Sequence, residues 1–116
     1  MRAAVLILAL VGGTAQACGY CVEDKIAAVY DHQVVTRARE ARHEVVFLHV
    51  DGRVTRQALE QAAYAAGADR GTVRVSADLL TVSFALDPGR NGLGRVHPAM
   101  EKRLKGVSLM PFEVMK

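Results

Sequence analysis

The run from His43 to Val50 (HEVVFLHV) restricts the fold more than any other stretch of the chain. It is rich in β-branched residues and carries apolar side chains at both odd and even positions, which is typical of a strand covered on both faces. Asp51-Gly52 follows it and predicts a turn. A chain built around such a strand needs a layer of structure on each side of its sheet.

A helix and a hairpin are predicted after this turn. Thr55 is a good N-cap for a helix over 56–66, and Gly67 is placed to end it. Period-two alternation over 72–76 and 79–86 predicts the two strands of a hairpin. One face of this hairpin is apolar, formed by Val73, Val75, Leu80, Val82, Phe84 and Leu86. The other face carries the small residues Thr81, Ser83 and Ala85.

The C-terminal part predicts a loop, a short helix and a last strand. Residues 87–95 form a glycine-rich loop, and a helix follows at about 98–105 with Pro98 in its first turn. The strand predicted over 107–115 contains Pro111, which is typical of a strand at the edge of a sheet.

These elements follow one another as β-α-β-β-α-β, with crossovers expected to be right-handed. The compact arrangement is an α+β, ferredoxin-like fold. It has a four-stranded antiparallel sheet in the order 4-1-3-2 and two helices on one face. The doubly apolar strand then lies in the centre, and the strand with proline lies at an edge.

A further helix is predicted ahead of this domain, over 22–42. Apolar residues recur there at three- and four-residue steps, with acidic residues in the first turn and arginines in the last. Its apolar stripe is narrow and rich in alanine, so it needs a surface to lie on. We expect it to cover the second face of the sheet, beside the small residues of 79–86. A homodimer paired through that face is the competing interpretation.

The N-terminus has the pattern of an export signal. Arg2 precedes the apolar run 3–11, which is too short to span a bilayer, and Ala15-Gln16-Ala17 is an A-x-A cleavage motif. Cleavage after Ala17 would send the mature protein to the periplasm or the exterior. Cys18 would then be its first residue.

Three segments follow from this pattern: a signal peptide (1–17), a CxxC with the N-terminal helix (18–42) and a ferredoxin-like domain (43–116). The chain has 15 Lys and Arg against 12 Asp and Glu, a balance too mild to predict nucleic acid as a partner. No second apolar span follows the signal. We therefore expect no membrane insertion after cleavage.

Cys18 and Cys21 are the only cysteines of the chain and have CxxC spacing. In an oxidising compartment such a pair forms a disulfide by default. As thiolates, the same two residues can converge on one soft ion such as Cu(I), Zn(II) or Hg(II). Cleavage before Cys18 would add its free amino group to such a site. Disulfide, metal site and thiol–disulfide exchange all stay open at this point.

Roughly residues 44–116 resemble the heavy-metal-associated domain of copper chaperones and metal-transport ATPases. The resemblance rests on the stretch VFLHVDGRVTRQALEQAAYAAG, with its Val50-Asp51-Gly52 turn, and on the order of the elements after it. In that family the turn continues as Met-x-Cys-x-x-Cys, and the two thiolates bind a soft metal ion. Arg53, Thr55 and Ala58 occupy those positions here. The resemblance thus implies the fold and transfers no metal ligand to this loop.

The histidines are predicted to have structural or solvent-exposed roles. His32 lies about 16 Å along a straight helix from Cys21, too far to join its site. His43 and His49 flank the first strand roughly 20 Å apart. His97 precedes the predicted helix start at Pro98. Thioether ligands for copper are a further hypothesis, although methionine at such positions is more often core filler; the candidates are Met100, Met110 and Met115.

The sequence predicts a small exported protein that is not an enzyme, because it shows no nucleophile–base pair and no HExxH motif. The leading hypothesis is chaperone- or sequestration-like binding of copper or a similar soft metal through Cys18 and Cys21. The alternative is a periplasmic interaction module in which the same pair is a structural disulfide, with a protein partner or a second copy on the sheet face. Thiol–disulfide exchange is the enzymatic alternative.

Overall fold

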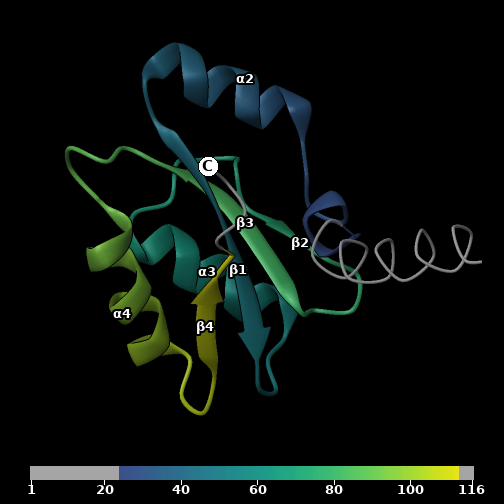
Figure 1. The fold of residues 1–116 in the computed structure, drawn as a ribbon. Helices are drawn as coiled ribbons and strands as arrows, with labels where there is room; N and C mark the ends of the chain where they lie inside the picture. The colour runs from purple at the N-terminus through teal and green to yellow at the C-terminus, as the bar shows by residue number, and fades with distance from the viewer. Residues whose placement is uncertain (1–23, 113–116) are drawn as a thin grey trace, which may run out of the picture.

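The structure is a computed structural model that describes residues 24–112 (Figure 1). The fold is α+β, with one four-stranded antiparallel sheet in the order β2-β3-β1-β4. The elements are α2 (His32–Ala41), β1 (Glu44–Asp51), α3 (Arg56–Ala66), β2 (Arg74–Val75), β3 (Thr81–Leu86), α4 (Leu93–Arg103) and β4 (Ser108–Pro111). Counted from the other edge, the order is the predicted 4-1-3-2. Among the described residues no helix is long and apolar enough to cross a membrane.

β1 lies in the centre of the sheet, between β3 and β4. Leu48 and Val50 are fully buried on one face, and Phe47, which points to the opposite face, is 3% exposed. The prediction of a central strand covered on both sides is confirmed. Its physical basis is the absence of a polar face that water could solvate.

α3 and α4 cover the first face of the sheet (Figure 1). Side chains from both helices, from β1, β3 and β4 and from the segments that connect them form one hydrophobic core, and Val75 of β2 packs against it partly buried. The buried members of this core are Leu48, Val50, Leu59, Ala62, Ala63, Val73, Val82, Phe84, Leu86, Val96, Met100, Leu104, Val107 and Leu109. α3 begins and ends where predicted. Gly67 ends it with φ +126°, and a Cβ there would lie 2.6 Å from Cγ of Asn91, so this position requires glycine.

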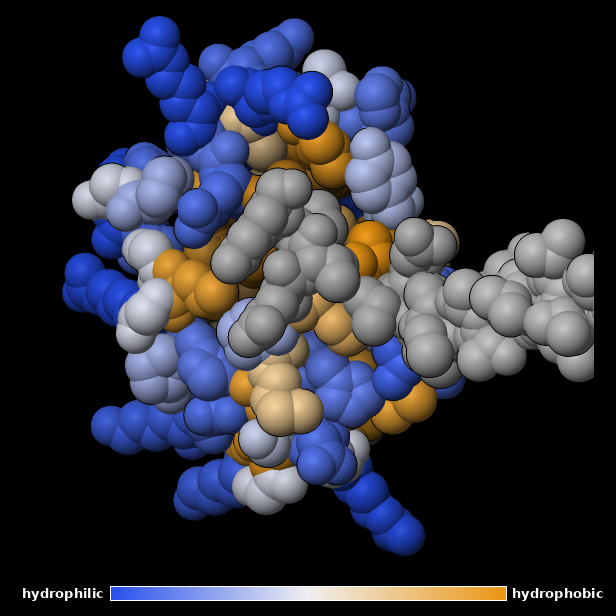
Figure 2. Space-filling model, in the orientation of Figure 1, coloured by the Kyte–Doolittle hydropathy of each residue, from blue (hydrophilic) through white to orange (hydrophobic). Residues whose placement is uncertain are grey.

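α2 covers part of the second face (Figure 1). Val34 and Ala38 are buried against Ala85 of β3 and Val45 of β1. In Figure 2, hydrophilic residues lie on the outer side of α2, and apolar residues lie between it and the centre of this view. The small residues of β3 admit the helix as predicted, because bulkier side chains would hold it away from the sheet.

The prediction of one continuous helix over 22–42 is wrong. Residues 24–27 are helical, 28–31 are not, and α2 starts at His32. Asp31 has extended backbone (φ −130°, ψ 112°), and its side chain accepts hydrogen bonds from the N–H groups of Gln33 and Val34 at 2.9 and 3.3 Å. An Asp in this conformation starts a new helix, because it satisfies N–H groups that have no partner within the helix. The apolar periodicity continues across this interruption and conceals it.

The hairpin strands are shorter than predicted. β2 contains two residues and β3 starts at Thr81, because the chain turns between Ser76 and Leu80. Oδ1 of Asp78 accepts from the Ser76 hydroxyl at 2.6 Å and from the Leu80 N–H at 3.0 Å, and Leu79 has a left-handed φ of 63°. Leu80, predicted in the core, is 39% exposed as a result.

α4 starts at Leu93, so residues 93–95 of the predicted loop are helical and Pro98 lies inside the helix. Gly92 is the N-cap, and its carbonyl accepts from the N–H groups of Arg95 and Val96. The glycines around Leu93 predicted a loop, whereas the packing of Val96 on the core favours the longer helix. Pro98 removes one backbone hydrogen bond from it.

β4 lies at an edge, as its proline predicted, and it spans Ser108–Pro111; residues 113–115 of the predicted strand are outside the described residues. Side chains of α4 bind the outward-facing backbone of this strand. The N–H of Leu109 donates to Oε2 of Glu101 at 2.8 Å, and Nε2 of His97 donates to the Leu109 carbonyl at 2.5 Å. His97 is therefore not a helix-start residue but a link between α4 and β4, and this part of the edge is closed to a further strand.

Candidate functional site

Cys18 and Cys21 lie outside the described residues, so their metal-bound or disulfide state stays a prediction. The described chain begins at residue 24. Nζ of Lys25 donates to Nδ1 of His49 at 3.4 Å. The segment that follows the CxxC thus contacts the end of β1 that leads into the Val50-Asp51-Gly52 turn.

The loop after this turn does not fit a metal site. Thr55 and Ala58 occupy the positions of the cysteines in the heavy-metal-associated family. Here the Thr55 hydroxyl accepts a hydrogen bond from the Ala58 N–H at 3.1 Å and caps α3. A capping hydroxyl and a methyl group are not ligands for a soft ion. The loop therefore starts a helix and offers no thiolate.

The structure does not bring the histidines of the chain together at one site. His32 is exposed on α2, with Nε2 3.5 Å from Oγ1 of Thr36. His49 lies edge-on to Phe112, with ring centroids 6.3 Å apart. Within residues 24–112 no group of three or more His, Cys, Asp or Glu side chains is placed to hold a metal ion.

The methionines differ in their surroundings. Met100 is fully buried in the core and is filler. Met110 is 53% exposed and lies opposite His49 in the register of β4 and β1. Met115 is outside the described residues. Only Met110 is accessible among the methionines that the structure describes.

A cluster that the sequence did not predict forms around His43. Nδ1 of His43 donates to Oδ2 of Asp69 at 2.5 Å, and Nε2 lies 3.8 Å from Oδ2 of Asp87. The hydrogen bond with Asp69 raises the pKa of His43 above its usual value; partial burial opposes this, and the charges of both carboxylates add to it. The imidazolium form is favoured. Because the partners lie 26 and 44 positions away, no local pattern could have predicted this cluster.

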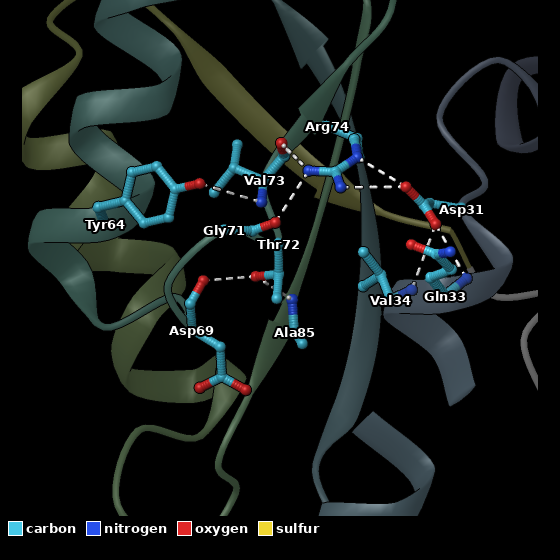
Figure 3. A network of polar contacts seen from close by, with 10 residues as sticks. All are labelled: Asp31, Gln33, Val34, Tyr64, Asp69, Gly71, Thr72, Val73, Arg74 and Ala85. Carbon is cyan, nitrogen blue, oxygen red and sulfur yellow. Dashed lines mark hydrogen bonds and ion pairs between the residues drawn. The ribbon is translucent and has the colours of Figure 1, made fainter. Parts of the chain in front are cut away.

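Arg74 connects the sheet to the start of α2 (Figure 3). Its Nε and Nη2 both lie 3.0 Å from Oδ2 of Asp31, and its Nη1 donates to the carbonyls of Gly71 and Val73 at 3.0 Å. The N–H of Val34 and this guanidinium both lower the pKa of Asp31, with the N–H having the larger effect. Asp31 therefore caps the helix and anchors it to β2 at once.

Thr72 holds residues 69–74 against β3 (Figure 3). Its hydroxyl donates to the Asp69 carbonyl at 2.6 Å and accepts from the Ala85 N–H at 3.1 Å. The Asp69 N–H donates to the Ala85 carbonyl at 2.8 Å. This segment is thus fixed facing α2.

A cavity of about 280 Å³ lies between α2 and residues 69–74. Its apolar lining comes mainly from alanines of α2 and β3, and its polar lining includes three arginines. The lining residues are Gln33, Val34, Arg37, Ala38, Ala41, His43, Asp69, Arg70, Gly71, Thr72, Arg74 and Ala85. No pattern in the sequence predicted this site, since its walls come from three separate segments.

Comparison of the chain with protein-family models, with curated proteins and with solved structures finds no match. The relation to the heavy-metal-associated family therefore stays a prediction that rests on element order and on the turn at Gly52.

Proposed function

We propose that this chain is a small exported protein that binds a soft metal ion, such as Cu(I) or Zn(II), through Cys18 and Cys21. The metal is its cargo, held for sequestration or transfer, and the protein is not an enzyme. The proposal includes a ferredoxin-like βαββαβ domain preceded by an added helical segment. It also includes export to the periplasm or the exterior by the A-x-A signal.

The observation that carries the proposal is the contact between Lys25 and His49, with Nζ 3.4 Å from Nδ1. His49 lies just before the turn after which the resembling family carries its two cysteines. Cys21 is four residues before Lys25, so their Cα atoms are at most about 15 Å apart. This contact supports the proposal, because it links the segment that follows the CxxC to the end of the sheet at which that family binds its metal.

The ligand chemistry agrees with this position. Two thiolates with CxxC spacing favour soft ions over hard cations. If cleavage follows Ala17, the amino group of Cys18 supplies a nitrogen ligand beside its own thiolate. Because thiols must lose their protons to bind, metal affinity is expected to fall as the pH falls.

The test starts from protein exported by its own signal and purified without air. Its intact mass, before and after reduction with alkylation, reports the cleavage point and the state of both cysteines. Competition titration with a Cu(I) chelator then measures binding. We expect stoichiometric Cu(I) uptake that Cys18→Ser with Cys21→Ser abolishes.

Met110→Leu is the matched control, since it removes the accessible thioether near His49 and leaves both thiols. It should keep the stoichiometry of the unaltered protein. A metal-free disulfide with no stoichiometric Cu(I) uptake after reduction would contradict the proposal.

A second candidate is an interaction module in which Cys18 and Cys21 form a structural disulfide. Burial of Val29, 4% exposed, favours it, because the segment after the CxxC is already anchored in the fold. Under this function the double serine variant would lower the melting temperature and leave the assembly unchanged. α2 covers part of the sheet face that the competing homodimer would use, so light scattering should report a monomer.

A further inference from the structure

We propose that the cavity between α2 and residues 69–74 binds a small organic carboxylate. This site is separate from the proposed metal function and uses none of its residues. The proposal rests on the shape of the cavity, the balance of charge around it and the rigidity of its wall.

The cavity exists because small residues meet between α2 and β3. Ala38 and Ala41 face it from α2, and Ala85 faces it from β3. Val34 adds to the apolar lining. Larger side chains at these positions would fill the space, whereas alanines leave about 280 Å³ open. This volume is just below the range of about 300–1,000 Å³ that is usual for small-molecule pockets, so it suits a compact ligand with an apolar body.

Two of the four cationic groups on the lining already have partners. Arg74 is paired with Asp31, and His43 is paired with Asp69. Such paired groups contribute little net attraction for a further anion. Their role is to position the walls.

Arg37 and Arg70 differ from Arg74 and His43 in their surroundings. Both are exposed, both line the cavity, and neither has a carboxylate within ion-pair distance among residues 24–112. With His43 as the imidazolium, the lining has four cationic groups and one carboxylate, Asp69, and two carboxylates outside the lining, Asp31 and Asp87, lie within 3.8 Å of Arg74 and His43. One positive charge is left over, which matches a monocarboxylate better than a phosphate dianion.

A carboxylate also matches the donors. A guanidinium can present two parallel N–H groups to both oxygens of a carboxylate. Arg37 comes from the helix and Arg70 from the opposite wall, so the two can hold the charged end between them. The apolar body would then lie on the alanines, and the side-chain amide of Gln33 offers a further donor.

The wall that carries Arg70 is held in place before any ligand binds (Figure 3). Thr72 joins it to Ala85 of β3, and Arg74 joins it to Asp31. A site whose walls are already ordered loses less entropy on binding. The binding free energy then depends mainly on the two arginines.

The test is an NMR titration of the full chain with benzoate, with benzyl alcohol and inorganic phosphate as comparison probes. We expect saturable shifts with benzoate at the cavity residues, and at least tenfold weaker binding of the other two probes. Arg37→Gln with Arg70→Gln should weaken benzoate binding tenfold or more. Arg95→Gln with Arg103→Gln, which removes the same charge from exposed positions of α4, should leave it unchanged.

Three results would overturn the proposal. Absence of saturable shifts would mean that there is no site. Equally tight binding of benzyl alcohol and benzoate would show that the cavity does not select for an anion. Equal weakening by the two pairs of substitutions would show general attraction to a basic protein. Because all four arginines are exposed, these variants should fold, and circular dichroism would verify this.

Discussion

The two faces of the sheet are covered by different kinds of interaction. Under α3 and α4 lies a continuous apolar core centred on fully buried residues such as Phe84. Between α2 and the sheet, the buried apolar cluster of the described residues consists of Val34 and Ala38 of α2 and Ala85 of β3. Polar contacts of Asp31 and His43 accompany it. We therefore expect the first face to supply most of the free energy of folding, because it buries more apolar surface. The second face leaves a cavity of about 280 Å³ open.

The largest expected effect lies on the first face. Phe84→Ala should lower the free energy of unfolding by about 3–5 kcal/mol, because it removes a fully buried ring and leaves a cavity. Denaturant unfolding followed by circular dichroism measures the loss. A loss below 1 kcal/mol would contradict the expectation that the first face contributes most of the free energy of folding.

A matched pair of valines compares the faces directly. Val82 of β3 is fully buried against the α3 and α4 layer, and Val34, on the inner side of α2, is 7% exposed. Val82→Ala should cost about 2 kcal/mol, from about 0.8 kcal/mol for each carbon removed plus a cavity term. Val34→Ala should cost about half as much, since its surroundings are already open. Equal losses in the same unfolding assay would show that both layers are packed alike.

Asp31 tests whether polar contacts hold the second layer. Asp31→Ala should cost about 1 kcal/mol, the usual effect of losing an N-cap. Hydrogen exchange should accelerate in α2 and remain unchanged in β1 and β3, because α2 can open locally. Asp31→Asn, which can still cap the helix, is the control and should restore most of the stability. Faster exchange throughout the sheet would show instead that α2 and the core unfold together.

The smallest effect is expected from His43 and depends on pH. The pKa of His43 is raised in the folded protein, so its contribution to stability is complete below its unfolded pKa of about 6.5 and is lost as the pH rises through the folded pKa. His43→Gln should remove that part of the pH dependence. Melting temperatures across this range, with His32→Gln as an exposed control, measure it. An unchanged profile would mean that the contact with Asp69 does not stabilise the fold.

Local signals predicted some elements well. α3 has the predicted bounds because Thr55 and Gly67 act through hydrogen bonds and backbone angles within a few residues. The central position of β1 followed from its two apolar faces. The predicted single helix over 22–42 failed, since its apolar period continues through residues 28–31 while Asp31 starts a new helix.

The two candidate sites, the CxxC and the cavity, also differ in how far the sequence could predict them. Cys18 and Cys21 were predicted from their CxxC spacing alone, and they lie outside the described residues, so that site stays a prediction. The cavity was missed, because Arg37, Arg70 and Ala85 belong to three segments that no sequence period relates. The glycines and proline around α4 were misleading for a related reason, since burial of Val96 outweighs the local preference for a loop.

The sequence by itself therefore determined the α+β class, the strand order and the extent of α3, and it left a helix or a second copy as the two candidates to cover the second face. All of these depend on burial patterns and caps that operate along short stretches of chain. Only the tertiary structure decided that Asp31 pairs with Arg74, that His43 lies between Asp69 and Asp87, and that a cavity stays open beneath α2. Those contacts join residues from distant positions, and their energies exist only after the sheet has brought the segments together.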